Sequence, residues 1–248
     1  MLRLNTFIIS HFSEKARWAL DLNGLAYTER LLIPGPHVLV IRRLAKGTSV
    51  PTLEHDGTVV QGSGKILDYL EQRMGATRLA APPAAAKRAA EIEAAADRAF
   101  GLGTQRIFYA TLLDHRSVVV DMWTQDGPAW SRAYFAVAFH AVAHLVRRAY
   151  KIQPDAVARA KDLFRRTMDT TDLALAEGPY LLGDTLSRAD ITVASLLAPL
   201  CTPPEHVLRW PAFVPPEHAV FVDEFRGRPT WDFVLRMYRE HRRTAPRA

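Results

Sequence analysis

The sequence predicts an α/β module followed by an all-α module. The first third of the 248 residues alternates short strand-like and helix-like segments, whereas the rest has helical periodicity almost throughout. Between them lies a proline- and alanine-rich stretch, ATRLAAPPAAA, at residues 76–86. We therefore expect an N-terminal domain at 1–76, a linker at 77–86 and a C-terminal domain at 87–248.

The N-terminal module is predicted to contain a four-stranded mixed sheet with helices on both faces. Gly24 ends the first helix, and Pro34-Gly35-Pro36 breaks the chain after the second strand. Asp56-Gly57 predicts a hairpin turn between the third and fourth strands. The resulting order is βαβ-α-ββα, with strands at 2–9, 27–33, 52–55 and 58–61 and helices at 13–23, about 37–45 and 63–74.

The C-terminal module is predicted to be a helical bundle. Its helices are expected near 87–114, 128–150, 154–176, 188–200 and 229–242. Proline and glycine mark the breaks between them, and the proline-rich segment 203–216 is expected to form an irregular loop or short turns of helix.

Composition excludes several classes of protein. With 48% hydrophobic residues and no run near the roughly 18 apolar residues of a membrane span, we expect a cytoplasmic protein with no membrane partner. The N-terminus also lacks the pattern of a signal peptide. Cys201 is the only cysteine, which excludes an internal disulfide and a cysteine-based zinc site. His140 and His144 have metal-like spacing but no third ligand, so no metal is expected.

The formal charge of +6 comes mostly from arginine, with doublets at 42–43, 147–148, 165–166 and 242–243. Such charge attracts anions and nucleic acid. The doublets are scattered, and the aromatic residues between them follow apolar helical periodicity. We therefore expect solvated helix faces and no nucleic-acid partner.

Ser10 marks the first candidate site, at the junction between the first strand and the first helix. A helix N-terminus offers unpaired N–H groups and the positive end of the helix dipole, so it favours a bound anion. The Ser10 hydroxyl can donate a further hydrogen bond to that anion. The alternative is that Ser10, or Ser13 a turn later, only caps the helix.

Two further segments of this module have site-like chemistry. In TSVPTL, residues 48–53, a cis Val50-Pro51 bond would turn the backbone of Val50 outward to pair with a peptide-like ligand, whereas a trans proline would only enter an edge strand. In QGSGKI, residues 61–66, the Ser63 hydroxyl and nearby N–H groups form a candidate carboxylate site. Ser63 as a simple cap is the alternative, and the segment does not fit a Walker phosphate loop.

Together these segments resemble the cytosolic glutathione S-transferase superfamily. SHFSEKARWAL at residues 10–20 looks like the family's first-helix motif, SVP matches its cis-proline, and Ser63 with Ile66 matches its Ser-x-x-Ile motif. LLGDTLSRADITVASL, residues 181–196, is similar to the family's capping box, in which Ser187 and Asp190 cap a helix reciprocally. A serine-type bacterial member is the nearest description, because neither cysteine nor tyrosine occupies the position of Ser10.

The resemblance implies a thioredoxin-like N-terminal domain that binds glutathione as co-substrate. It also implies a helical C-terminal domain that covers a small hydrophobic electrophile, and a homodimer that acts in detoxification. Ser10 would stabilise the glutathione thiolate as the catalytic residue. The implied glutathione-binding residues are Ser10, His11, Phe12, Val50, Pro51, Gln61, Gly62 and Ser63. The expected acceptor site comprises Phe108, Tyr109, Leu112 and Trp123, with Trp130 as a further candidate, and packing in the core is the alternative for each.

Two residues depart from the family pattern. Gly62 replaces an acidic or amide side chain that holds the γ-glutamyl end, so Gln61 or a partner subunit would have to compensate. His11 replaces a frequent proline; we expect it to face solvent, with a second donor role as the alternative. Three functions therefore remain open: conjugation of glutathione to electrophiles, glutathione-dependent isomerisation or peroxide reduction, and non-catalytic ligand binding or protein interaction.

Overall fold

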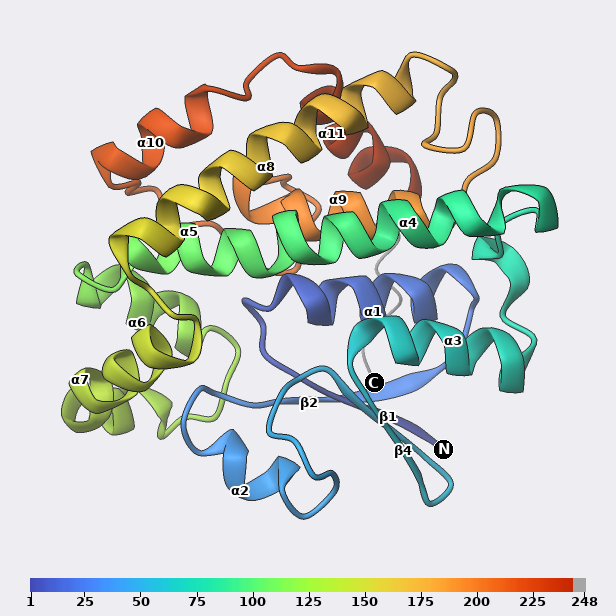
Figure 1. Ribbon diagram of the computed structural model, residues 1–248. Helices are drawn as coiled ribbons and strands as arrows, with labels where there is room; N and C mark the ends of the chain where they lie inside the picture. The colour runs from blue at the N-terminus through green and yellow to red at the C-terminus, as the bar shows by residue number, and fades with distance from the viewer. Residues whose placement is uncertain (243–248) are drawn as a thin grey trace.

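The computed structural model describes residues 1–242. Residues 243–248, which the sequence assigns to the C-terminal domain, lie outside the described residues, and so does Arg243 of the last arginine doublet. The N-terminal domain is a sheet with helices on both faces, and the helices of the C-terminal domain stack on the side that α1 and α3 cover (Figure 1).

The sheet confirms the predicted thioredoxin-like topology. Its strand order is β2-β1-β3-β4, with β1 and β2 parallel and the other neighbours antiparallel. Asp56 and Gly57 both have positive φ, as the hairpin turn between β3 and β4 requires. The elements are β1 (Leu2–Thr6), α1 (His11–Leu22), β2 (Tyr27–Leu31), α2 (His37–Ile41), β3 (Thr52–His55), β4 (Thr58–Gln61) and α3 (Ser63–Met74).

Helix α1 is buried on every side, between α3 of its own domain and α9 (Arg188–Cys201) of the other. Its apolar residue Trp18 is fully buried and lies 4.6 Å, centroid to centroid, from the ring of Tyr238. Lys15 and Arg17 are also fully buried, and each is paired with carboxylates. A buried charge is tolerated only with partners. Lys15 finds them in Glu93 and Asp97 of the C-terminal domain and so joins the domains, whereas Arg17 pairs with Glu29 within the N-terminal domain.

The C-terminal domain corrects three sequence predictions. The long helix expected at 87–114 is divided into α4 (Ala86–Ala96), a π-helical turn at Asp97–Leu102 and α5 (Gly103–Leu112). Two short helices were not expected, α6 (Arg116–Thr124) and α10 (Pro216–Asp223). Pro216 ends the segment 203–216, for which an irregular loop or short turns of helix were expected, and it begins α10, because proline fits the first turn of a helix, where its missing N–H is not needed.

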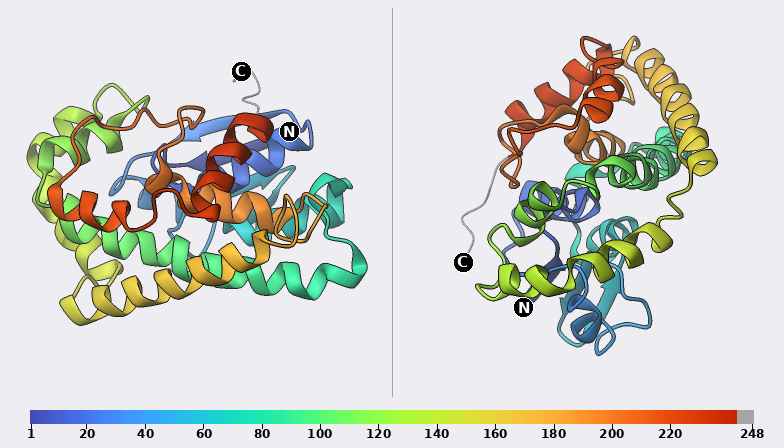
Figure 2. Two further views of the ribbon diagram at one scale, coloured as in Figure 1. Left: turned by 90° about the horizontal axis from the view of Figure 1, so that it is seen from above. Right: turned by 90° about the vertical axis from the view of Figure 1, so that its left-hand side faces the viewer.

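The remaining helices are close to their predicted bounds. They are α7 (Ser131–Ala149), α8 (Pro154–Leu175), α9 and α11 (Pro229–His241). Short 3₁₀ turns at 77–79 and 83–85 occupy the expected linker. Helices α5 and α8 lie side by side. In the right-hand view of Figure 2, α10 (red) lies at the top of the molecule and α2 (blue) at the bottom.

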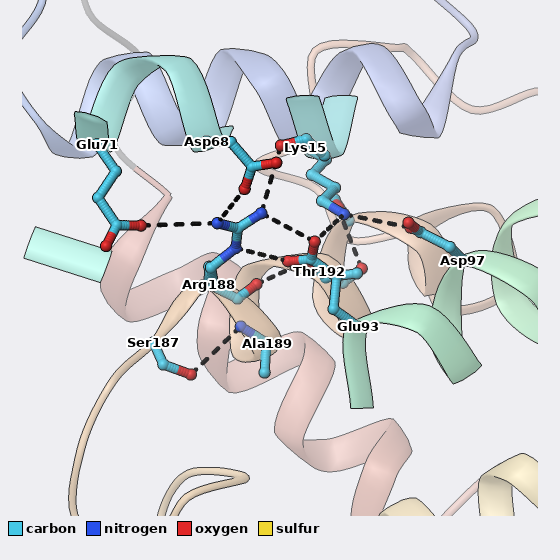
Figure 3. A network of polar contacts seen from close by, with 11 residues as sticks. Lys15, Asp68, Glu71, Glu93, Asp97, Ser187, Arg188, Ala189 and Thr192 are labelled. Carbon is cyan, nitrogen blue, oxygen red and sulfur yellow. Dashed lines mark hydrogen bonds and ion pairs between the residues drawn. The ribbon is translucent and has the colours of Figure 1, made fainter. Parts of the chain in front are cut away.

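A network of ion pairs joins the two domains around the start of α9 (Figure 3). Ser187 caps this helix and Asp190 bonds back to the Ser187 N–H, so the expected capping box is present. The next residue, Arg188, donates to Glu93 on α4 at 2.9 Å and to Asp68 on α3 at 2.7 Å. Because these carboxylates come from both domains, Arg188 fixes the position of one domain on the other.

Arg242 corrects the expectation that the arginine doublets are solvated. Its guanidinium is buried and pairs with Glu14 and Asp21 of α1, each at 2.6 Å.

None of the helices within residues 1–242 is both long and apolar enough to cross a membrane. In the same range, no cluster of three or more His, Cys, Asp or Glu residues has the arrangement of a metal site.

Candidate functional site

A cleft of about 670 Å³ opens between the two domains. The N-terminal domain supplies the chain before and at the start of α1, the start of α2 and the segment before β3. The C-terminal domain supplies one face each of α5, α6 and α7, together with the segment 210–215 and the start of α10. The lining is mostly apolar, with a small number of polar side chains, which is the usual composition of a small-molecule site.

Ser10 lies at this cleft and caps α1. Its Oγ accepts a hydrogen bond from the Ser13 N–H at 3.1 Å, and its extended backbone precedes a helix that begins at His11 rather than at Ser13. The hydroxyl hydrogen is still available for a donor bond, since a serine oxygen can accept and donate at once. The two interpretations of Ser10, cap and anion donor, are therefore compatible in this geometry.

His11 corrects the expectation of a solvent-facing histidine. Only 5% of its surface is exposed, because its ring enters the interface between the domains and its Nε2 lies 3.1 Å from the carbonyl oxygen of Gly101. Burial lowers the pKa of His11 to about 4, so the ring is neutral at pH 7. Nε2 then carries the hydrogen and donates it to Gly101, which leaves Nδ1 without one. In this arrangement His11 therefore cannot act as a second hydrogen-bond donor, beside Ser10, to a bound anion.

Phe12 packs against the same turn of the C-terminal domain. A Cβ atom placed on Gly101 would overlap the ring of Phe12, so glycine permits this close approach. Gly101 belongs to the π-helical turn between α4 and α5. Such turns are frequent at functional sites. Here the turn receives His11 and Phe12 and so holds the first turn of α1 at the cleft.

The Val50-Pro51 bond is cis, and Val50 lines the cleft. The β3–β4 pairing sets Thr52 opposite Gln61, and the Gly62 N–H donates to the Pro51 carbonyl at 2.9 Å. The second and third candidate segments therefore lie side by side.

Ser63 is the first residue of α3 and is 5% exposed, and Gly62 before it has a φ of 99°, which glycine tolerates best. The Gln61 side-chain amide donates to the carbonyl oxygen of Ser49 at 2.8 Å. Pro51, Gln61, Gly62 and Ser63 are not among the residues that line the cleft; they lie beside it, next to Val50.

The four residues expected at the acceptor site, Phe108, Tyr109, Leu112 and Trp123, all line the apolar part of the cleft. The Trp123 indole N–H donates to the Tyr109 hydroxyl at 2.9 Å, and the Tyr109 ring stacks on Tyr150 with centroids 5.6 Å apart. Burial raises the pKa of Tyr109, which is therefore protonated at neutral pH. Trp130 is 52% exposed and is not part of the lining.

The polar side chains of the lining that sequence reasoning missed include His37, Thr104, Tyr150 and His218. Thr104 lies one helical turn before Phe108, so helical spacing from Phe108 would have identified it. No local pattern marked His37, Tyr150 or His218, because each reaches the cleft from a different helix or from the end of one.

Comparisons with known proteins agree with this architecture. Residues 4–78 match the family model described as the N-terminal domain of glutathione S-transferase. No curated protein matches the sequence.

Solved structures resemble nearly the whole chain. A beta-etherase from Sphingobium sp. strain SYK-6 is 19% identical with a TM-score of 0.61, over 95% of this chain and 98% of its own. A glutathione S-transferase from Rhodospirillum rubrum is 19% identical with a TM-score of 0.59, over 97% and 99%. A glutathione S-transferase from Ceriporiopsis subvermispora, solved in complex with glutathione, is 16% identical with a TM-score of 0.60, over 99% of each chain.

Likeness at these identities establishes a shared fold, and the match to the family model lies in the first domain. The protein therefore has a glutathione S-transferase-like fold, and its residues 4–78 match the model of the glutathione S-transferase N-terminal domain.

Proposed function

We propose that the protein binds glutathione and conjugates its thiolate to small hydrophobic electrophiles. The observation that carries this proposal is the position of Ser10, whose hydroxyl caps α1 at one end of an apolar cleft between the domains. A thiol held there meets a hydroxyl donor and the positive end of a helix dipole. An apolar acceptor can lie beside it on the face of α5.

The electrostatics of this position suit thiolate formation. A free thiol has a pKa near 8.5, so it is only a few per cent ionised at neutral pH. Lowering that pKa by about 2 units makes the thiolate predominant and requires about 2.7 kcal/mol. A charge-assisted hydrogen bond from Ser10, together with the N-terminus of α1, is of the size needed.

The remaining glutathione contacts are assigned to the adjacent segments. The backbone of Val50 would pair with the peptide part of glutathione, and the Ser63 hydroxyl with the first N–H groups of α3 would bind a carboxylate. A structural neighbour solved in complex with glutathione supports this choice of thiol. We further propose a serine-type bacterial transferase that acts in detoxification as a homodimer.

A conjugation assay tests the proposal. Purified protein is mixed with glutathione and 1-chloro-2,4-dinitrobenzene, and glutathione binding is measured separately by calorimetry. Turnover above the rate without enzyme, with saturable glutathione binding, is the expected result. Absence of both would contradict the assignment of glutathione as the donor substrate.

Non-catalytic ligand binding is the second candidate, and Gly62 favours it. This position has no side chain to pair with an ammonium group. The Gln61 side chain, whose nitrogen donates to the Ser49 carbonyl, offers an ammonium group only its neutral amide oxygen, so neither residue supplies a negatively charged partner. Tight glutathione binding without turnover would support this candidate.

A further inference from the structure

Thr104 on α5 is a buried residue of the cleft lining whose hydroxyl has no hydrogen-bond partner among residues 1–242. It is 2% exposed. Each of the other threonines within the described α-helices donates its hydroxyl, to a carbonyl of its own helix or to Asp172: Thr111, Thr124, Thr167, Thr170, Thr171, Thr192 and Thr230. Thr104 is the second residue of α5, just after the π-helical turn, where the regular helix geometry is interrupted.

His218 is a second buried polar residue of the same lining. It is 8% exposed and lies in the first turn of α10. Its ring meets the ring of Phe108 at a centroid distance of 3.9 Å with an interplanar angle of 72°. Burial lowers the pKa of His218 to about 4, so one ring nitrogen carries a hydrogen and the other a lone pair at pH 7. Neither nitrogen has a hydrogen-bond partner in the described part of the chain.

Thr104 and His218 are both neighbours of Phe108. Thr104 precedes Phe108 by four residues, so the two side chains share one face of α5, while the imidazole of His218 contacts Phe108 from α10. A buried polar group without a partner is unfavourable, and native structures rarely retain one without a reason. The Thr104 hydroxyl is such a group, and the ring of His218 lines the same cleft, where a ligand can bond to both.

We propose that Thr104 and His218 bind a neutral oxygen atom of the electrophilic acceptor, while the aromatic or aliphatic body of that acceptor lies on Phe108. The inference rests on the proposed function and narrows its substrate class to apolar electrophiles that contain a carbonyl, ether or hydroxyl oxygen. The threonine hydroxyl and the imidazole N–H both donate to such an oxygen. Threonine has two accessible rotamers in a helix, so its hydroxyl can turn toward the ligand.

A neutral group fits this position better than an anion. The surrounding lining is mostly apolar, and transfer of a charge from water into such a site is costly without a counter-ion. A carbonyl or ether oxygen needs only one or two donors. The pair therefore fixes the orientation of an uncharged acceptor on Phe108.

The test uses two ligands of similar shape, benzophenone and diphenylmethane, which differ by one carbonyl oxygen. Binding is followed by quenching of tryptophan fluorescence, because Trp123 and Trp210 line the cleft. Thr104→Val and His218→Phe are each expected to weaken benzophenone binding about fivefold and to change diphenylmethane binding less than twofold. Thr104→Ser, which keeps the hydroxyl, should bind benzophenone as the original protein does.

Matched substitutions outside the lining control for indirect effects. Thr111→Val changes a threonine of the same helix whose hydroxyl bonds to the Phe108 carbonyl, and His140→Phe changes an exposed histidine on α7. Neither should alter the affinity for either ligand. Thr104→Val is nearly isosteric and removes an unpaired hydroxyl, so it should fold even if His218→Phe does not.

Equal weakening of both ligands, or no weakening of either, would overturn the inference. The assay with glutathione is run in parallel on an aryl enone, 4-phenyl-3-buten-2-one, and on benzyl chloride, which has no oxygen. A selective loss of kcat/KM for the enone supports the inference. If the unsubstituted protein turns over neither compound, the proposed function fails, whereas the two binding ligands still decide the role of Thr104 and His218.

Discussion

The Nε2–H of His11 donates to the carbonyl oxygen of Gly101 at 3.1 Å and thereby joins the first turn of α1 to the π-helical turn between α4 and α5. Ser10, the residue before His11, is the proposed thiolate-stabilising residue. The same turn receives Phe12, the residue after it. The position of Ser10 therefore depends on a contact between domains as well as on its own helix.

The free energy of unfolding should fall as the pH is lowered from about 6.5 toward 4. Burial lowers the pKa of both His11 and His206 to about 4, whereas each takes up a proton near pH 6.5 when unfolded. Between these values only the unfolded state binds the protons, so acid favours unfolding. Each histidine contributes at most about 3 kcal/mol to the fall.

Urea unfolding at pH 7.5, 6 and 5 measures this effect, and His11→Gln provides a control. The Gln amide can donate to Gly101 but does not titrate in this range, so the fall should be smaller in this variant. Glu14 is expected to act at lower pH: burial would raise its pKa, but Arg242 and Arg17 hold it at about 2. An identical pH dependence in His11→Gln would contradict the assignment to His11.

Gly101→Ala should destabilise the protein by about 1–3 kcal/mol, because the added methyl group overlaps the ring of Phe12 in a packed interface. The midpoint of urea denaturation measures the loss. Phe12→Leu in the same chain should recover part of it, since the smaller side chain makes room. If the two substitutions are additive, the overlap is not the cause of the loss.

Arg188→Met should destabilise the protein by about 3 kcal/mol, because it leaves the carboxylate of Glu93 buried with fewer partners at the junction of the domains (Figure 3). Arg159→Met is the matched control. Arg159 forms an exposed i, i+4 pair with Asp155 on α8, and its loss should have little effect. Equal effects of the two substitutions on unfolding would show that the Arg188 network does not join the domains.

Ser63→Ala should weaken glutathione binding about tenfold while the pKa of the bound thiol stays unchanged. The hydroxyl is assigned to a carboxylate of glutathione, and a hydrogen bond to a charged group is worth about 1.5–3 kcal/mol. Calorimetry measures the affinity and ultraviolet absorbance of the thiolate measures the pKa. Ser117→Ala, at an exposed position on α6, should change neither quantity. A comparable loss of both in Ser63→Ala would show that the two tasks are not divided between Ser10 and Ser63.

Features that depend on a few neighbouring residues could be predicted from the sequence. Asp56-Gly57 specified the hairpin, because both positions need positive φ. Ser187 and Asp190 specified a helix start, because their bonds span only three residues. The order of strands and helices followed from such local patterns, and with it the thioredoxin-like sheet.

Features that depend on distant contacts could not be predicted. His11 is buried because of Gly101, 90 residues further along the chain. The π-helical turn has the same residue types as the helices on either side, so periodicity alone indicated one continuous helix. His218 becomes a neighbour of Phe108 only when α10 packs on α5. Ser10, where the thiol is proposed to bind, was thus marked by a local pattern in the sequence, whereas His218 was not.

The pH titration of bound glutathione in Ser10→Ala, followed by thiolate absorbance, tests the central claim most directly. With Ser10 present, the thiol pKa should lie about 2 units below its free value near 8.5. Removing the hydroxyl should raise it toward that value, whereas Ser117→Ala should leave it unchanged. A titration curve that is the same with and without the Ser10 hydroxyl would contradict the account of Ser10 as the group that stabilises the thiolate.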